Sequence, residues 1–390
     1  PARTASGALV AHTDTDMDSD TDDARRLTLD GVPVTPPGLQ VREVLGVDGE
    51  DILFTAFDDP TETHLWTYRA GTGPRRLSTE PGVHTGTRRG GTLVHLARPA
   101  GRPGTRATVH RPGRPAVTVT STADEPVLRL RATELTTTDR ALRSRLLLPS
   151  WHRPGDGPLP VLVDPYAGPA LQRVTATHDP HSLVSQWFAE QGFAVLVTDG
   201  RGTPGRGPRW EREIHGDILG PVLDDQVAAL HETARRHPEL DLGRVAVRGW
   251  SFAGTLAVAA VLRRPDVFHA AVAGAGLSDQ RLYDTHWRER FLGHPGDHPG
   301  RYEAGSTLPE APNLTRPLLL VHGLADDNVF PAGTLRLSAA LLAAGRPHEV
   351  LPLSGTSHDA TGEAVFENLL RHQLDFLRRH LDQVAGEAPE

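Results

Sequence analysis

Residues 244–254 read Arg-Val-Ala-Val-Arg-Gly-Trp-Ser-Phe-Ala-Gly, a short apolar strand that leads through a serine into a run typical of a helix. Gly249, Ala253 and Gly254 keep the positions around Ser251 small, which lets a strand and a helix approach closely on either side of a sharp turn. The usual pattern is Gly-x-Ser-x-Gly, and Ala253 stands at the second glycine position. The stretch predicts a serine at a nucleophile elbow, with an ordinary strand-to-helix turn as the alternative.

A serine hydroxyl is a weak nucleophile and needs a base, which in turn needs an orienting carboxylate. After a nucleophile elbow, the acid and then the base follow the serine in the chain. Asp326 follows an apolar run at 318–321, and His358 follows a strand-like run at 349–353. The order Ser251, Asp326, His358 therefore predicts a catalytic triad.

The C-terminal part of the chain alternates short apolar strands with longer amphipathic segments. Strands are predicted at 161–163, 193–197, 244–247, 270–272 and 318–321. Helices are predicted at about 182–191, 222–236, 252–264, 333–344 and 361–382. Continuous apolar strands joined by helical crossovers favour a mostly parallel sheet that is covered on both faces. The predicted fold class is α/β, with an α/β-hydrolase domain and a doubly wound sheet over residues 131–390.

Residues 1–130 have a different texture, in which short β-like runs are broken by Gly, Pro, Asp and Thr clusters. The runs at 51–56, 63–68 and 91–96 are typical of an antiparallel β array. At about 40–45 residues per blade, this region holds about three propeller blades, too few to close a ring. We expect either a partial β-propeller, the last blades of a truncated one, or a small open β domain. The chain begins at Pro1 and its only methionine is Met17, which indicates a fragment or a processed chain.

Composition excludes several classes of chemistry. The 390 residues contain no cysteine, and all 41 basic side chains apart from histidine are arginine. Disulfides, thiolate catalysis, a P-loop lysine and a lysine Schiff base are therefore excluded. The net charge of −8 argues against nucleic acid as a partner. Apolar runs stay far below the ~18 residues of a membrane span, so we expect no membrane span. The location that we expect is cytoplasmic.

Motifs for cofactors and metals are weak. Residues 200–205 match Gly-x-Gly-x-x-Gly, but Pro204 argues against a helix that opens over a pyrophosphate. His231 and His237 lack the spacing of a zinc-binding helix. The acidic stretch 14–23 fits no register of a calcium loop. We expect neither a cofactor nor a metal.

Three segments carry a family resemblance: 249–254 around the serine, 322–329 around the acid, and Asp-Pro-Tyr-Ala-Gly-Pro at 164–169. Over residues 130–385 the chain resembles the prolyl oligopeptidase family of serine peptidases, and within it the dipeptidyl peptidase IV branch. The resemblance implies that Ser251 is the nucleophile, Asp326 the orienting acid and His358 the base.

The resemblance also implies an oxyanion hole and a proline pocket. Tyr166 matches a tyrosine whose hydroxyl, with the backbone N–H of Phe252, stabilises the oxyanion; the alternative is a packed aromatic. Tyr283 matches a pocket tyrosine, whereas Trp287 replaces a second one. Asn328 matches the residue that holds the carbonyl before the proline. The slot would be completed by Phe252, Leu277 and Val329.

The implied activity is cleavage of short peptides after proline or alanine, with release of N-terminal Xaa-Pro dipeptides through an acyl-enzyme. The alternatives are an acylaminoacyl peptidase, a prolyl endopeptidase or an esterase on the same fold, and third, an inactive hydrolase fold that serves as an interaction module. In the family, a glutamate pair and an arginine on the propeller bind the free amine of the substrate, and no segment of this chain matches them. The expected partner is a peptide substrate, and a homodimer is compatible with the sequence.

Overall fold

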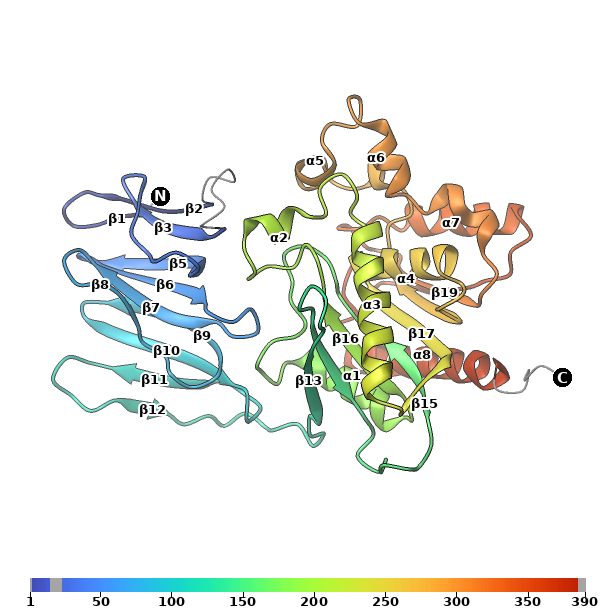
Figure 1. Ribbon diagram of the computed structural model, residues 1–390, viewed down its shortest axis with the longest axis horizontal. Coiled ribbons are helices and arrows are strands. Elements are labelled where there is room, and N and C mark those ends of the chain that lie inside the picture. The colour runs from blue at the N-terminus through green and yellow to red at the C-terminus, as the bar shows by residue number, and fades with distance from the viewer. Residues whose placement is uncertain (1, 15–22, 385–390) are drawn as a thin grey trace. The chain divides into compact units, whose positions relative to one another are not determined.

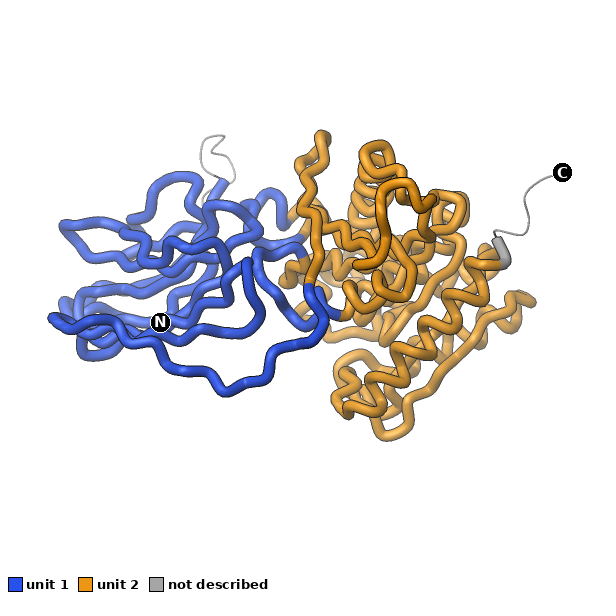
Figure 2. Tube along the Cα trace, turned by 90° about the horizontal axis from the view of Figure 1, so that it is seen from below, with its two compact units in different colours: residues 1–129, 174–183, 203–211 blue, residues 130–173, 184–202, 212–390 orange. Residues whose placement is uncertain are grey.

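The computed structural model describes residues 2–14 and 23–384. The chain divides into two compact units (Figure 2), of which the first comprises residues 1–129, 174–183 and 203–211 and the second residues 130–173, 184–202 and 212–390. Two short segments of the later chain thus group with the first unit. The domain boundary between residues 130 and 131 stays a prediction, and residues 15–22 of the acidic stretch lie outside the described residues.

In its described residues, the first unit contains three four-stranded antiparallel sheets, each made of strands that follow one another in the chain (Figure 1). The strands are β1 (Ala2–Arg3), β2 (Leu9–Asp14), β3 (Arg25–Leu29), β4 (Val32–Pro33), β5 (Gln40–Asp48), β6 (Asp51–Phe57), β7 (His64–Arg69), β8 (Gly73–Arg76), β9 (Gly82–Arg89), β10 (Thr92–Pro99), β11 (Arg106–His110) and β12 (Val117–Val119). The strands predicted at 51–56, 63–68 and 91–96 are confirmed as β6, β7 and β10. Their identity as propeller blades stays a prediction.

The core of the first unit is formed where the first two sheets meet. Every residue of β6 is buried, and its apolar side chains join those of neighbouring strands. The cluster consists of Val10, Leu27, Leu39, Val41, Ile52, Phe54, Ala56 and Tyr68. Burial of each large apolar side chain contributes about 1.5–3 kcal/mol, so this cluster holds the sheets together.

A row of histidines crosses the second and third sheets. The ring centroids are 5.3 Å apart for His64 and His84, 5.1 Å for His84 and His95, and 6.2 Å for His95 and His110. His84 Nδ1 and His95 Nε2 share a hydrogen bond of 2.9 Å. Burial, followed by the neighbouring His84 and His110, lowers the pKa of His95 to about 4. Burial also lowers the pKa of His84, so the folded state keeps both rings neutral at neutral pH.

This row predicts a loss of stability at acid pH. As the pH falls from 6.5 to about 4, the unfolded chain binds a proton at His95 that the folded chain does not, so the free energy of unfolding decreases. Because His95 is partly exposed, we reduce the expected loss in the free energy of unfolding to about 1 kcal/mol. A loss of that size lowers Tm by about 2–4 °C in a unit of about 150 residues. Thermal unfolding at pH 7.0 and at about pH 4.5 measures it. His95→Gln should reduce the change of Tm with pH. His372→Gln, at an exposed histidine, is the control and should leave that change as it is in the parent. An equal change of Tm with pH in the two variants would contradict the role of His95.

The second unit is built on one eight-stranded sheet with the order β13-β14-β16-β15-β17-β18-β19-β20. The pairs β13–β14 and β14–β16 are antiparallel and the other pairs are parallel. The strands are β13 (Ala132–Thr136), β14 (Arg143–Leu147), β15 (Leu159–Val163), β16 (Ala194–Asp199), β17 (Leu240–Trp250), β18 (Ala270–Gly274), β19 (Leu318–Gly323) and β20 (Glu349–Leu353). The predicted mostly parallel α/β sheet is confirmed.

The helices lie between or after these strands in the chain (Figure 1). They are α1 (Pro180–Glu190), α2 (Pro208–Arg212), α3 (Gly220–Arg236), α4 (Phe252–Arg263), α5 (Thr285–Leu292), α6 (Pro299–Ala304), α7 (Ala332–Ala343) and α8 (Glu363–Val384). The five predicted helices are confirmed as α1, α3, α4, α7 and α8. The short helices α2, α5 and α6 were not predicted, because one or two turns show too little periodicity. None of the described helices combines the length and apolar character of a membrane span.

Alternate side chains of β17 face opposite sides of the sheet. Val245 and Val247 join one apolar cluster with residues of α3, α4 and α7. Arg248 points to the other side, where it stacks on Phe188 of α1 and bonds Gln373 of α8. Both faces of the sheet are therefore covered by helices, and the carboxyl ends of the parallel strands are left to form a site.

Candidate active site

Ser251 lies between the last residue of β17 and the first residue of α4. Its backbone has φ 59° and ψ −119°, a conformation that side-chain-bearing residues adopt at a cost. A Cβ on Gly254 would collide with the carbonyl oxygen of Gly274, and one on Gly249 would collide with the backbone of Ala253. The small residues therefore let β17 and α4 meet at a tight turn, with Ser251 at the carboxyl edge of the sheet.

The structure brings Ser251, His358 and Asp326 together. His358 Nε2 lies 3.1 Å from Ser251 Oγ, and His358 Nδ1 lies 2.8 Å from Asp326 Oδ2. Because a carboxylate oxygen only accepts, Nδ1 carries the hydrogen and Nε2 is free to accept from the serine hydroxyl. This is the arrangement in which an imidazole can remove the serine proton.

The Asp326 side chain is wholly buried, and its remaining lone pairs are satisfied by the backbone. Its Oδ1 accepts from the N–H of Asn328 at 3.0 Å and from the N–H of Val329 at 2.8 Å. The neighbouring Asp327 instead accepts a hydrogen bond from Ser357 at an exposed position. Of the two adjacent aspartates, Asp326 is therefore the one that faces His358.

Two residues that hold the triad were not assigned a role from the sequence. Trp250 Nε1 donates to the carbonyl oxygen of His358 at 2.8 Å, which fixes the loop that carries the histidine. His322 Nε2 donates to the carbonyl oxygen of Val329 at 2.8 Å and lies 3.3 Å from Asp326 Oδ2. The only sequence signal for either is its place at the end of a strand beside the acid or the serine.

Tyr166 follows β15 and lies beside the serine turn. Its ring centroid is 6.3 Å from that of Phe252, and its hydroxyl interacts with Ser251. Burial raises the pKa of Tyr166, so its hydroxyl remains a hydrogen-bond donor at neutral pH. Phe252 begins α4, where backbone N–H groups have no partner within the helix. A phenol O–H and a backbone N–H are thus both next to Ser251.

The predicted pocket residues fall into two groups. Tyr283 donates its hydroxyl to Asn328 Oδ1 at 3.2 Å and contacts Trp287 edge-on, with 5.8 Å between ring centroids. These three residues are therefore brought together from α5, the segment before it and the acidic loop. Leu277 and Val329 are only 4% and 3% exposed, so they serve chiefly as core, and their part in binding stays a prediction.

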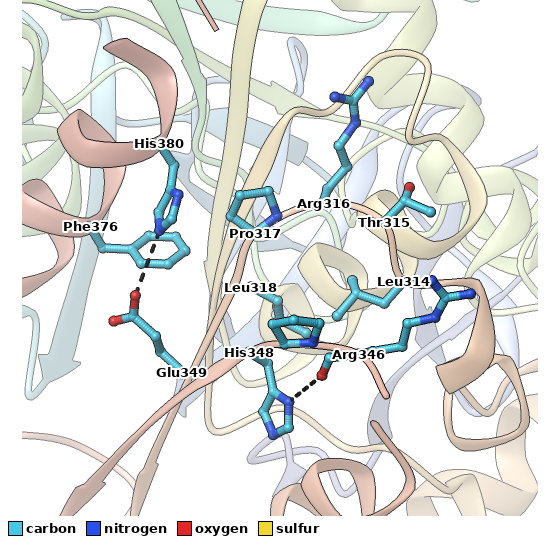
Figure 3. A pocket seen from close by; sticks show the side chains of 11 residues that line it. Leu314, Thr315, Arg316, Pro317, Leu318, Arg346, His348, Glu349, Phe376 and His380 are labelled. Carbon is cyan, nitrogen blue, oxygen red and sulfur yellow. Dashed lines mark hydrogen bonds and ion pairs between the residues drawn. The ribbon is translucent and has the colours of Figure 1, made fainter. Parts of the chain in front are cut away.

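A separate cavity of about 500 Å³ lies at the amino ends of β19 and β20 (Figure 3). His348 Nδ1 donates to the carbonyl oxygen of Arg346, and His380 lies 3.6 Å from Glu349. None of the predicted site residues lines this cavity, so it is distinct from the triad. Among residues 2–14 and 23–384, the structure shows no cluster of three side chains suited to a metal ion.

The sheet order and the serine turn define an α/β-hydrolase fold. A model of the prolyl oligopeptidase family matches residues 181–384. The chain belongs to this family.

Relatives within the family are dipeptidyl peptidases and an endopeptidase. The chain is 32% identical over 249 residues to human dipeptidyl peptidase 8, and this match covers 63% of this chain and 28% of the relative. It is 26% identical over 223 residues to bovine prolyl endopeptidase FAP, covering 56% and 29%. A crystal structure of Porphyromonas gingivalis dipeptidyl peptidase 4 matches with a TM-score of 0.86 and 25% identity, covering 97% of this chain and 55% of that one. The chain thus spans less than a third of these two curated relatives and about half of the solved chain.

The geometry around Tyr166 predicts a specific loss in Tyr166→Phe. The substitution keeps the ring and removes only the donor, so kcat on a chromogenic ester should fall roughly 10²–10³-fold, while Tm stays near that of the parent. Tyr68→Phe, at a buried tyrosine of the first unit, is the matched control and should leave kcat unchanged. An unaltered kcat in a folded Tyr166→Phe protein would show that Tyr166 only packs.

Proposed function

We propose that this chain is the catalytic part of a serine peptidase that cleaves short peptides after proline or alanine and releases N-terminal Xaa-Pro dipeptides. The observation that carries the proposal is the bridge made by His358, 3.1 Å from Ser251 Oγ and 2.8 Å from Asp326 Oδ2. Membership of the prolyl oligopeptidase family and similarity to dipeptidyl peptidases support the choice of a peptide bond as the target.

The reaction proceeds in two halves. Ser251 Oγ attacks the scissile carbonyl carbon while His358 Nε2 takes the hydroxyl proton. The protonated His358 then gives that proton to the departing amine nitrogen, which leaves an ester between Ser251 and the dipeptide. Water attacks this ester with His358 again as base, and the Ser251 hydroxyl is restored. Asp326 holds the imidazole in the tautomer that both halves need.

The negative charge of each tetrahedral intermediate forms beside Ser251. The Tyr166 hydroxyl and the Phe252 N–H are the two donors proposed to receive it. Donors that are already in place before the reaction stabilise the developing charge more than water does, because they need no reorganisation. The buried, protonated state of Tyr166 suits this role.

Substrate recognition is assigned to the aromatic corner formed by Tyr283 and Trp287. The two rings, with an interplanar angle of 78°, offer apolar surface to the pyrrolidine ring of proline. The side-chain amide of Asn328, exposed at the edge of the corner, would hold the carbonyl of the preceding residue. Phe252, Leu277 and Val329 complete the slot in this proposal.

The three sheets of the first unit are proposed to be blades of a β-propeller. Each has four antiparallel strands in chain order, which is the composition of a blade. The 97% coverage of this chain by the match to the bacterial dipeptidyl peptidase 4 supports the assignment. Residues 1–130 are then the propeller part and residues 131–390 the catalytic domain.

A prolyl endopeptidase is the second candidate. It is favoured by the similarity to bovine prolyl endopeptidase FAP. The two candidates differ in one property. An endopeptidase accepts a substrate with a blocked amine, and a dipeptidyl peptidase does not.

The proposal predicts selective cleavage of a Gly-Pro anilide over a Gly-Leu anilide. Leucine fails by shape in a slot for a ring, so kcat/KM should differ by more than the roughly 10–200-fold that a single methylene gives. The measurement is release of the chromogenic amine, and Ser251→Ala should abolish it.

An acetylated Gly-Pro anilide separates the two candidates, since only the endopeptidase cleaves it at the same rate. Equal rates on the proline and leucine anilides would refute the pocket assignment. Turnover that survives Ser251→Ala would refute the triad.

A further inference from the structure

Arg288, in α5, is a buried cation at the aromatic corner. The residue is only 5% exposed. Its guanidinium carbon lies 5.0 Å from the ring centroid of Tyr283 and 4.8 Å from that of Trp287. The charge therefore rests on the two rings proposed to form the substrate wall.

The guanidinium lacks the partners that a buried arginine normally has. Its Nε and Nη1 atoms are buried without a hydrogen-bond acceptor, and no carboxylate in the described parts of the chain forms an ion pair with it. Removing a charge from water is costly unless polar groups compensate for it. The two rings offset part of that cost through their electron-rich faces. A methionine would fill the same space without the cost.

Arg288 remains positively charged at neutral pH. Burial lowers its pKa to about 10, and Tyr283, Tyr302 and the carboxylate of Asp284 counteract the decrease. The charge also acts on Tyr166. Burial, followed by Tyr283, raises the pKa of Tyr166, and Arg288 offsets part of that rise. A positive charge that lowers the pKa of a phenol also makes its O–H a stronger hydrogen-bond donor.

We propose that Arg288 is a positioning residue of the oxyanion site, a buried cation whose field strengthens the Tyr166 hydroxyl as donor and stabilises the negative charge that forms beside Ser251. In the ground state the site holds a neutral carbonyl, and the carboxylate of Asp284 acts on the Arg288 charge without forming an ion pair with it. In the tetrahedral intermediate an oxyanion appears, and it gives the charge of Arg288 a second anion to stabilise. Its contribution is thus greater in the transition state than in the bound substrate.

This inference rests on the proposed function, and it predicts a change in kcat and not in KM. Arg288→Met removes the charge and keeps the length of the side chain. We expect kcat on the Gly-Pro anilide to fall about tenfold, as expected for loss of a nearby charge at an effective dielectric constant of about 20, with KM within about twofold. Arg288→Lys should recover most of the rate. Arg290→Met, at an exposed arginine of the same helix, is the matched control and should match the parent.

A boronic acid inhibitor based on proline provides a readout that packing alone does not move. Its adduct with the serine is a tetrahedral anion, whereas the bound ground-state substrate is neutral at the same atoms. Arg288→Met should weaken boronate inhibition about tenfold, in parallel with kcat. If Arg288→Met does not fold, Arg288→Gln gives the same test with a neutral hydrogen-bonding side chain.

The outcomes separate this inference from the function on which it depends. If the parent protein neither cleaves the anilide nor reacts at Ser251 with a fluorophosphonate probe, the proposed function fails. If the parent is active and a folded, uncharged variant keeps its kcat and boronate affinity, the role of Arg288 is overturned. A loss confined to KM also overturns it and marks Arg288 as a ground-state binding residue.

Discussion

The buried carboxylate of Asp326 is the group on which the site depends. Its side chain is fully enclosed, and a carboxylate in that position is tolerated only when its oxygens are satisfied. The N–H groups of Asn328 and Val329 bond one oxygen, and His358 bonds the other. The same contacts that stabilise the carboxylate therefore shape the acidic loop and set the orientation of the base.

This constraint extends from the triad to the proposed pocket. The loop that closes around Asp326 also presents Asn328, which accepts the hydroxyl of Tyr283. Tyr283 contacts Trp287, and Arg288 lies over both rings. His358, the proposed substrate wall and the buried cation are linked through one chain of contacts, and the close approach of β17 and α4 places Ser251 beside His358.

The sequence was most informative where the chemistry is local. The small residues around Ser251 and the order of the acid and base predict the elbow and the three side chains that the structure brings together. Apolar runs predict the parallel strands for the same reason, since burial on both faces leaves a continuous apolar signal. Helix α5 was missed, although Asp284 caps its first turn and Gly293 ends it. A search for caps as well as periodicity would find it.

Features that depend on distant contacts could not be predicted. The pairing of His322 with the acidic loop and the burial of Arg288 arise only when separate elements pack, and neither leaves a pattern in the neighbouring residues. The grouping of residues 174–183 and 203–211 with the first unit likewise has no local signal. In each case the feature is set by tertiary packing. The residues involved show no local pattern that distinguishes them from residues at the surface.

The comparison of Asp326→Asn with Asp327→Asn tests the central claim most directly. An asparagine at 326 keeps the size but removes the charge and presents the wrong partner to His358 Nδ1, so kcat should fall on the order of 10⁴-fold. Asp327→Asn changes a neighbouring carboxylate that bonds Ser357 at the surface, and its kcat should equal that of the parent. Equal losses in the two variants, or a greater loss at Asp327, would contradict the role assigned to the buried carboxylate.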